Sequence, residues 1–584
     1  MADKKIIINY TNRDFNSIKR DLENHARVYY PDTYKDFSEN SFGSYVIDAV
    51  SYVGDMLSFY LDYQVNESFL DTAIEYDNVR RLSKQYGYKY TSRPAAFGLA
   101  AFYILVPANT SGLGPDTQYV PILKTGAEVQ SQGNTTFVLT EEVDFNDGKN
   151  EVVAARFDDD TGKPTFYAIK AFGQVKSTVL FRTTVDIGDY TRFSRVRIGP
   201  DYISEIKSVF DSEGHEYYEV DHLTQDVVYV ETTNPNAKAD GVRSILKPRI
   251  VPRRFCLKQE SGGTFLQFGY GSDEEINTDP SQVSLKMSGR PYISDYAFDP
   301  TKLLDSNTLG VAPANTTLTI LYYANTDDSV NVNSGELNIV SRTAFDFINE
   351  SGTSTANNKN FVRNSIEVAN ETPIVGNTSL PSADEIRYRS YAAYASQNRS
   401  VTKNDYEVYC YMMPSKFGSI KRASIVNDPS ATNRRLSLYV CGEDSNFNLT
   451  TTNIVVKDNL KVWLNKNRML NDSIDIYDAK ILNIGFDYEI IVDPTRDKLQ
   501  VLNSVSTRLK REMSDKLYIG EPFYITSVYN IINKTKGVID TKNVRMKLMR
   551  GSKYKSASVS IQQMLSKDGT YLKTPRNVIL EILD

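Results

Sequence analysis

The sequence predicts a multi-domain α+β protein with an N-terminal helical segment, central, mostly antiparallel β domains and a small C-terminal α+β domain. Three patterns predict this fold class. Apolar residues recur at helical spacing before about residue 92, short β-branched and aromatic runs follow to about residue 345, and strand and helix patterns alternate after about residue 480. The 584 residues are enough for several domains, each with its own core.

Residues 1–92 are expected to be helical. Phe15, Ile18 and Leu22 recur at helical spacing, and a longer helix with a one-sided apolar stripe is expected after the break at Pro31. Because such a stripe cannot bury itself, we expect this helix to pack with helices of a partner. Its candidate partner-contact residues are Val46, Val50, Val53 and Leu57.

A third helix is expected to follow. The sequence Thr72-Ala-Ile-Glu75 has the spacing of a capping box, in which the side chain and backbone of the first and fourth residues exchange hydrogen bonds. Gly87 is expected to end this helix, because glycine readily adopts the left-handed conformation found after a helix C-terminus.

Residues 93–345 are expected to form one or two β domains. Runs such as TTFVLTEEVDF, QDVVYVETT and TLTILYYAN are rich in β-branched and aromatic residues and are separated by Gly, Asn, Asp and Pro. Without long helical patterns between them, such strands are typical of mostly antiparallel sheets. Residues 346–383 are poor in apolar side chains and are interpreted as an extended connector.

The remaining sequence is divided into a mixed α/β middle domain, 384–480, and a C-terminal α+β domain, 481–584. In the middle domain Thr402 is expected to cap a helix in whose first turn Asp405 lies, and Tyr406 is expected to supply packing. The C-terminal domain is expected to run strand, helix, helix, strand, with Val528 and Ile531 on its second helix.

Composition excludes several classes of function. The net charge of -6 and the pI of about 5.5 give no basic surface for nucleic acid. No apolar run approaches the roughly 20 residues of a membrane span, so no membrane insertion is expected. Three scattered cysteines predict no disulfide framework and folding in a reducing cytoplasm.

The sequence also offers little for catalysis. It has three scattered histidines and no nucleotide-binding loop, nucleophile elbow or zinc-binding helix motif. We therefore expect no catalytic residues, no metal ligands and no cofactor, and interpret the chain as a non-enzymatic assembly subunit.

Four stretches resemble the baseplate wedge subunits of T-even-type contractile-tailed phages, within the wider baseplate-J-like group. They are PILKTGAEVQSQGNTTFVLTEE (121–142), GGTFLQFGYGSDEE (262–275), ANETPIVGNTSLPSADEIRYRSYAAYASQNRSVTKNDYEVYCYMMP (369–414) and IGEPFYITSVYNIINKTKGVIDTKNVRM (519–546). Tyr270 stands where the family usually has an acidic residue, and Gly376-Asn377 replaces a usual Gly-Gly pair. The stretches occur in the family's order along most of the chain.

This resemblance implies a virion protein of the tail baseplate, assembled in the host cytoplasm. It implies that the subunit pairs with itself within a wedge, binds other wedge proteins, and joins neighbouring wedges into an inner ring around the central hub. We expect the C-terminal domain to mediate the ring contact and the 350–380 connector to absorb movement on contraction. Further candidate interface residues are Arg399, Tyr406, Val528 and Ile531.

Two alternatives remain open. A receptor-binding or tail-fibre protein would be a trimer that binds cell-surface glycans. A virion glycan hydrolase would need two carboxylates at working distance in a cleft. The mass of the native assembly, alone and with other tail proteins, separates these alternatives from a wedge subunit.

Overall fold

The structure is a computed structural model that describes residues 14–33, 36, 38, 41–89, 93–110, 113–160, 162–199, 202–234, 244–260, 262–272, 309–325, 327, 329–347, 355–427, 435–513, 516–551, 554 and 561–582. Contacts between residues divide the chain into two compact units. The first consists of Met1–Tyr90 and Pro381–Gln397, and the second of Thr91–Leu380 and Asn398–Asp584. Two distant parts of the sequence therefore build the first unit.

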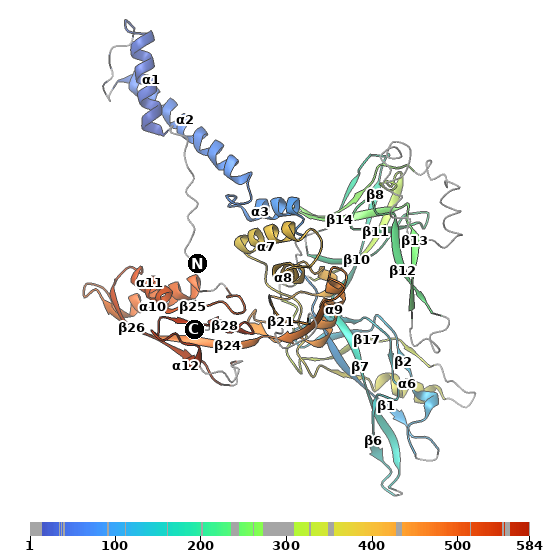
Figure 1. Cartoon of the computed structure of the whole chain (residues 1–584). Coiled ribbons are helices and arrows are strands. Elements are labelled where there is room, and N and C mark those ends of the chain that lie inside the picture. The colour runs from blue at the N-terminus through green and yellow to red at the C-terminus, as the bar shows by residue number, and fades with distance from the viewer. Residues whose placement is uncertain are drawn as a thin grey trace. The chain divides into compact units, whose positions relative to one another are not determined.

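The predicted N-terminal helices are present in the first unit. They are α1 (Phe15–Tyr29), α2 (Phe42–Glu67) and α3 (Tyr76–Ser83), which the 3-10 helix η1 (Lys84–Tyr86) extends. Gly87, with a φ of 82°, ends this helix as expected. Figure 1 shows α1 beside one end of α2.

The expected capping box at Thr72 is not formed. α3 begins at Tyr76, and its N-cap residue Glu75 makes no side-chain cap hydrogen bond. The Thr72 hydroxyl instead donates to the carbonyl oxygen of Asn66, 2.6 Å away. Thr72 therefore lies in a tight turn after α2, and not at the start of α3 as the motif predicted.

Helix α7 (Ala383–Ser396) belongs to the first unit, although the sequence placed its residues at the start of the middle domain. It packs against α3 and η1. Sequence proximity suggested the wrong neighbour here, because helices pair by their apolar faces and not by their order in the chain.

The second unit begins with a β domain whose sheet has the strand order β17-β3-β4-β7-β1-β19, with β6 paired to β7. These described strand pairs are antiparallel, as predicted. The strands are β1 (Phe97–Pro107), β3 (Glu128–Ser131), β4 (Thr136–Leu139), β6 (Glu151–Phe157), β7 (Pro164–Ser177), β17 (Leu337–Arg342) and β19 (Glu367–Ala369). A small sheet of β2 (Ile122–Leu123), β5 (Val143–Asp144) and β18 (Phe345–Asp346) lies with it, as do η2 (Thr117–Tyr119) and α6 (Ala356–Asn364).

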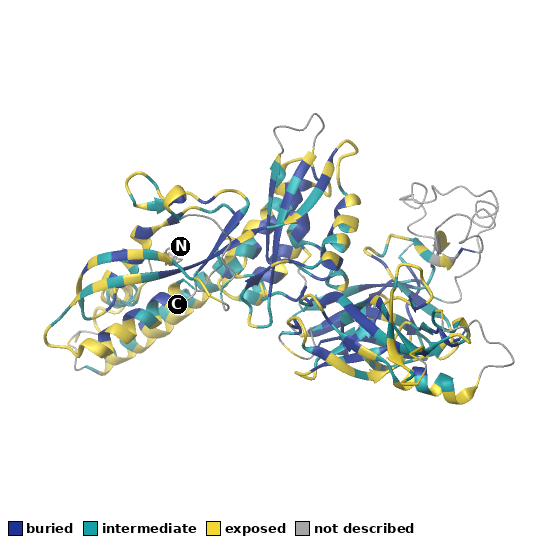
Figure 2. Cartoon of the chain, turned by 90° about the horizontal axis from the view of Figure 1, so that it is seen from below, coloured by how far each residue is buried: buried dark blue, intermediate teal, exposed yellow. Residues whose placement is uncertain are grey.

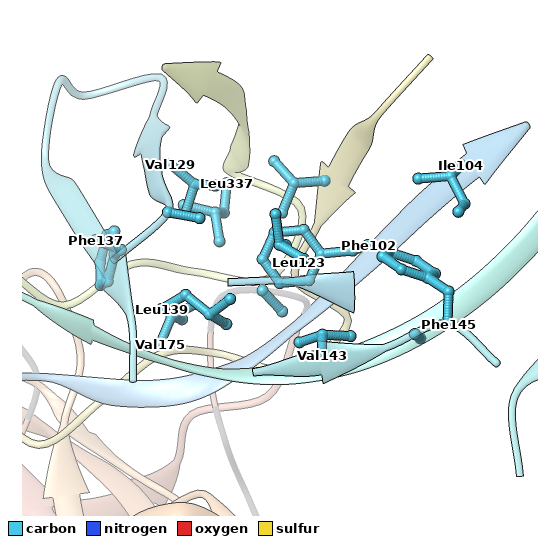
Figure 3. Packing of buried hydrophobic residues seen from close by; sticks show 14 of the residues in the cluster. Phe102, Ile104, Leu123, Val129, Phe137, Leu139, Val143, Phe145, Val175 and Leu337 are labelled. Atoms are coloured by element: carbon cyan, nitrogen blue, oxygen red, sulfur yellow. The ribbon is translucent and has the colours of Figure 1, made fainter. Parts of the chain in front are cut away.

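The core of this domain lies between the large sheet and the segments packed on it. Figure 3 shows Phe102 of β1, Leu123 of β2 and Phe137 of β4 converging on one buried cluster. Gly173 of β7 is required here, because a Cβ on it would lie 2.6 Å from a methyl group of Val143.

A second large sheet follows, with strand order β8-β16-β10-β11-β14-β15-β9. All its described pairs are antiparallel except β11 with β14, so the prediction of mostly antiparallel β domains is confirmed. The strands are β8 (Val179–Ile187), β9 (Arg195–Gly199), β10 (Ile203–Phe210), β11 (Glu216–Glu219), β14 (Arg254–Glu260), β15 (Gly263–Phe268) and β16 (Thr316–Ala324). A separate two-stranded ribbon pairs β12 (Val227–Thr233) with β13 (Ser244–Ile250).

The segment 346–383 is not an extended connector. α6 lies within it, and β19 pairs with β1 at the edge of the first large sheet. Ile374 and Val375 are buried, and Val375 bridges to Phe97. The few apolar residues of this segment are therefore part of the β-domain core, which corrects the expectation.

The middle domain contains α8 (Lys403–Tyr411), η6 (Ser415–Phe417), α9 (Ile454–Asn465) and a sheet of β20 (Arg422–Asn427), β21 (Arg435–Glu443), β22 (Leu449–Thr450) and β23 (Ser473–Asp478). The predicted cap of α8 is confirmed. Thr402 and Asp405 form a complete capping box, in which each side chain accepts from the other residue's backbone N–H.

The C-terminal domain has the predicted order of strand, helix, helix and strand in β24 (Lys480–Val492), α10 (Lys498–Glu512), α11 (Ile525–Asn533) and β26 (Val538–Leu548). β28 (Val578–Ile582) pairs in parallel with β24. The remaining short elements are β25 (Phe523–Tyr524), α12 (Ile561–Met564) and β27 (Tyr571–Leu572). The second half of β24 alternates between exposed and half-buried residues, which Figure 2 shows as alternating yellow and teal. The predicted multi-domain α+β fold class is confirmed.

Candidate interaction surface

Helix α2 uses its small residues to pack against α1. Ser44 and Ser51 are buried on it, and a Cβ on Gly54 would lie 3.1 Å from Cδ1 of Ile18 on α1. Beside them, Lys19 Nζ forms an ion pair with Asp48 Oδ1 at 2.8 Å. Small side chains let two helices approach closely, so this face of α2 is the one that α1 covers.

The large apolar residues of α2 lie on another face and stay exposed. We call five of them the α2 seam: Val46, Val50, Val53, Leu57 and Tyr60. Their exposed fractions are between 42% and 58%. Successive members are separated by four or three residues in alternation, which is the heptad spacing of helices that pack side by side.

No charged side chain flanks the seam on α2. The neighbouring positions on one side are Ala49, Met56 and Tyr63, and those on the other are Ile47, Gly54 and Leu61. The acidic residues Asp48, Asp55 and Asp62 fall on the face of the helix away from the seam. The seam is therefore an uncharged apolar strip of several helical turns.

A buried carboxylate fixes the turn that follows α2. Glu67 Oε1 accepts the backbone N–H of Ile74 at 2.7 Å and that of Glu75 at 3.2 Å, and Glu67 Oε2 accepts Nδ2 of Asn78 at 2.9 Å. Burial alone would raise the pKa of Glu67, but these hydrogen bonds and the nearby Arg387 guanidinium together lower it. Glu67 therefore stays ionised and holds the start of α3.

Helix α7 holds the same turn from the other side. Arg387 Nε donates to the carbonyl oxygen of Leu70 at 2.9 Å, and its Nη2 donates to that of Ala73. The Tyr391 hydroxyl donates to Asp71 Oδ1 at 2.7 Å, and this contact, with burial, raises the pKa of Tyr391 to about 12. The end of α2 is thus fixed by side chains from both sequence segments of its unit.

The other predicted interface residues fare differently. Arg399 is exposed after α7, and Ile531 is half-buried on α11. Tyr406 is buried in the middle domain, where its hydroxyl donates to Asp472 Oδ2 at 2.6 Å, and Val528 is buried in the C-terminal core. A one-sided apolar stripe looks the same whether a core or a partner covers it, and for these two residues it is a core.

Sequence reasoning missed three residues of this region. Tyr60 continues the heptad spacing of the seam, and counting in steps of four and three would have found it. Glu67 and Arg387 gave no signal in the sequence, because their partners are backbone groups of a turn several residues away or in a distant segment.

Among the described residues, no group of three or more His, Cys, Asp or Glu side chains is arranged to hold a metal ion. Cys256, Cys410 and Cys441 are buried free thiols, and burial raises the pKa of Cys441 to about 12. None of the described helices combines the length and the apolar character that a membrane span requires.

Residues 14–85, which contain α1, α2 and α3, match the family model described as "Bacteriophage baseplate protein, N-terminal domain". This segment is similar to the N-terminal domain of a phage baseplate protein. The matched residues include the α2 seam. The match supports the interpretation that this chain is a structural protein of a tail baseplate. No curated protein matches the sequence significantly.

Two solved structures are similar over most of their length. One is the baseplate of the anti-feeding prophage, with 8% identity, a TM-score of 0.27, and coverage of 98% of this chain and 99% of that chain. The other is the TssK-TssF-TssG baseplate subcomplex of the type VI secretion system, with 10% identity, a TM-score of 0.23, and coverage of 75% and 96%. Likeness at these TM-scores does not establish a shared fold.

Proposed function

We propose that the chain is a wedge subunit of a contractile-tail baseplate, which builds the inner ring around the central hub and transmits conformational change on contraction. The match of residues 14–85 to a baseplate N-terminal domain is the observation that supports this most. The ordered resemblance of four stretches to T-even-type wedge subunits extends the support along the rest of the chain.

The α2 seam is the proposed contact with partner helices. Its uncharged flanks place no like charge against a second apolar helix, so a copy of this chain or another wedge protein can pack there. The heptad spacing puts Val46 and Val53 at d positions and Leu57 at an a position, and β-branched residues at d favour bundles of more than two helices over a two-stranded coil. The seam therefore suits a bundle that combines two copies with a further wedge protein.

The proposed movement on contraction needs a new location. Residues 350–380 were expected to absorb it, but α6, β19 and the buried Val375 tie this segment into the β domain. We propose that the chain bends where it passes from one compact unit to the other, near Leu380 and Gln397. Gln397 and Asn398 are consecutive residues with a positive φ, a conformation that few side chains adopt.

The proposed ring contact lies on the C-terminal α+β domain. Its helix α10 carries exposed Leu499 and Leu502 beside the buried Val501 and Val505, so this helix keeps an apolar surface after its own core is complete. A ring requires the contact to close with the symmetry of the baseplate. Assembly in the host cytoplasm fits the buried free thiols.

Native mass measurement tests this proposal against its alternatives. The wedge proposal predicts a dimer alone and larger mixed complexes after co-expression with neighbouring tail proteins. A stable trimer that binds cell-surface glycan would support the receptor-binding alternative, and turnover of bacterial glycans would support the hydrolase. A monodisperse monomer that binds no tail protein would contradict the proposal.

A further inference from the structure

A cluster of buried charges lies where the middle domain meets the C-terminal domain, within the second compact unit. Its centre is Glu443, at the end of β21, which is fully buried. Glu443 Oε1 lies 3.0 Å from Nζ of Lys516 and 3.6 Å from Nζ of Lys421. Two lysines thus balance a carboxylate that no water reaches directly.

Glu443 also holds the end of the 346–383 segment. The backbone N–H and the hydroxyl of Ser379 both donate to its carboxylate, the hydroxyl at 2.9 Å, and Lys421 Nζ donates to the same hydroxyl. Ser379 lies two residues before Pro381, where the chain enters the other compact unit. Glu443 therefore binds Ser379 just before the chain leaves the second compact unit.

A second buried acid extends the cluster into the C-terminal domain. Glu581 of β28 lies 3.9 Å from Lys516 Nζ and accepts hydrogen bonds from the backbone N–H of Leu449 on β22 at 2.6 Å and from Asn483 Nδ2 at 2.7 Å. Burial raises the pKa of Glu581, and the Leu449 amide and the Lys516 ammonium oppose this rise. Lys516 is thus the counter-charge that the two buried acids share.

Arg422 holds the backbone of the same loop. Its guanidinium donates to the carbonyl oxygens of Lys516 at 2.6 Å and Leu517 at 3.2 Å, and it lies 4.5 Å from the centre of the Tyr518 ring. The loop after α10 is therefore positioned by its backbone, which leaves the Lys516 side chain to join the two acids.

We infer that Glu443, Lys516 and Glu581 form a charge clamp that makes the segment around Ser379, the middle sheet and the C-terminal domain move as one body. Opening the clamp at Lys516 releases Ser379 and Leu449 together, although these residues lie on different segments. The contacts stand without any assumption about function, and only the part that the clamp plays in transmitting contraction rests on the proposed function.

Hydrogen exchange on the full chain tests the clamp, because the amides of Ser379 and Leu449 are its direct reporters. Lys516→Met is expected to speed exchange at both amides about tenfold, since each acid loses the same counter-charge. Lys516→Arg keeps the charge and is expected to keep both amides protected. Glu443→Gln is a second variant, expected to speed exchange at Ser379 most.

Lys547→Met is the matched control, because Lys547 pairs with Asp487 in the same domain while both side chains are exposed. It is expected to leave both amides unchanged. The inference is wrong if Lys516→Met leaves either amide as protected as in the unaltered chain, or if Lys516→Arg exposes both amides as much as Lys516→Met. None of these measurements requires a baseplate, so failure of the clamp and failure of the proposed function are separate results.

Discussion

At the scale of single residues, a buried carboxylate decides how the N-terminal helices turn. Glu67 takes the place of a helix cap, because it accepts the amides of Ile74 and Glu75 ahead of α3. Its negative charge at the N-terminus of a helix is also favourable for the helix dipole. This turn therefore begins after the α2 seam has ended at Tyr60.

Glu67→Gln is expected to destabilise this turn by about 1.5–3 kcal/mol at neutral pH, because a buried charged acceptor is lost. The folded-state pKa of Glu67 is lowered, so its contribution is present above the pKa of the unfolded chain and is lost as pH falls through the folded value. The difference between the two proteins should therefore shrink below about pH 4.3. Hydrogen exchange of the segment around Ile74, followed from pH 7 to pH 3, measures it.

Equal exchange of the two proteins at neutral pH would contradict this role of Glu67. Asp55→Asn on the same helix serves as the control, because Asp55 lies twelve residues before Glu67.

Tyr406 was expected at an interface, and its burial leads to a different prediction. Tyr406→Phe removes a buried hydroxyl that donates to Asp472, and is expected to cost the middle domain about 1–3 kcal/mol of unfolding free energy. Binding of partner proteins should stay unchanged. Denaturant unfolding followed by fluorescence of Trp463, which packs against the core cluster that contains Tyr406, measures the first effect. A loss of partner binding without loss of stability would show that Tyr406 does lie at an interface.

At the scale of elements, α2 has one face that packs against α1 and another that is proposed to bind partner proteins. Its small face, with Ser51 and Gly54, holds α1, and its seam is left exposed. Val53→Asp combined with Leu57→Asp should therefore change the thermal midpoint of the isolated chain little, because surface substitutions are usually within about 0.5 kcal/mol. Ser51→Asp should lower it, since it forces a charge against α1. Calorimetry of the two variants checks this, and a large loss of stability in the seam variant would mean that the seam is internally covered.

The sequence was informative about elements whose apolar residues are periodic. α1 and α2 were predicted near their positions because their apolar residues recur at helical spacing, and α8 was predicted from its N-cap residue Thr402. The segment 346–383 was not, because Val368, Ile374 and Val375 are isolated among Asn, Ser and Thr and show no period. Val368 and Val375 pair with β1, a strand far away in the sequence, and Ile374 bridges to Val332.

At the scale of the whole molecule, local sequence patterns also fail to show which helices belong to the same compact unit. α7 follows the β domain in the sequence, yet it joins the N-terminal helices through Arg387 and Tyr391. No local pattern encodes such a contact, because its partners are carbonyl oxygens and a carboxylate more than three hundred residues earlier. Some interface candidates are exposed and others lie in a core for a related reason. Periodicity marks an apolar face but does not show whether a core or a partner covers it.

The account as a whole depends on the α2 seam as a contact with other baseplate proteins. The most direct test is the fraction of the chain recovered in mixed complexes after co-expression with neighbouring tail proteins, compared between two variants of α2. Val53→Asp with Leu57→Asp alters the seam, and Tyr52→Asp with Val65→Asp alters exposed apolar residues of the same helix outside the seam. The account predicts that only the seam variant loses the complexes, by about tenfold or more, because burying an unpaired charge costs several kcal/mol. Equal recovery of both variants in the complexes would contradict it.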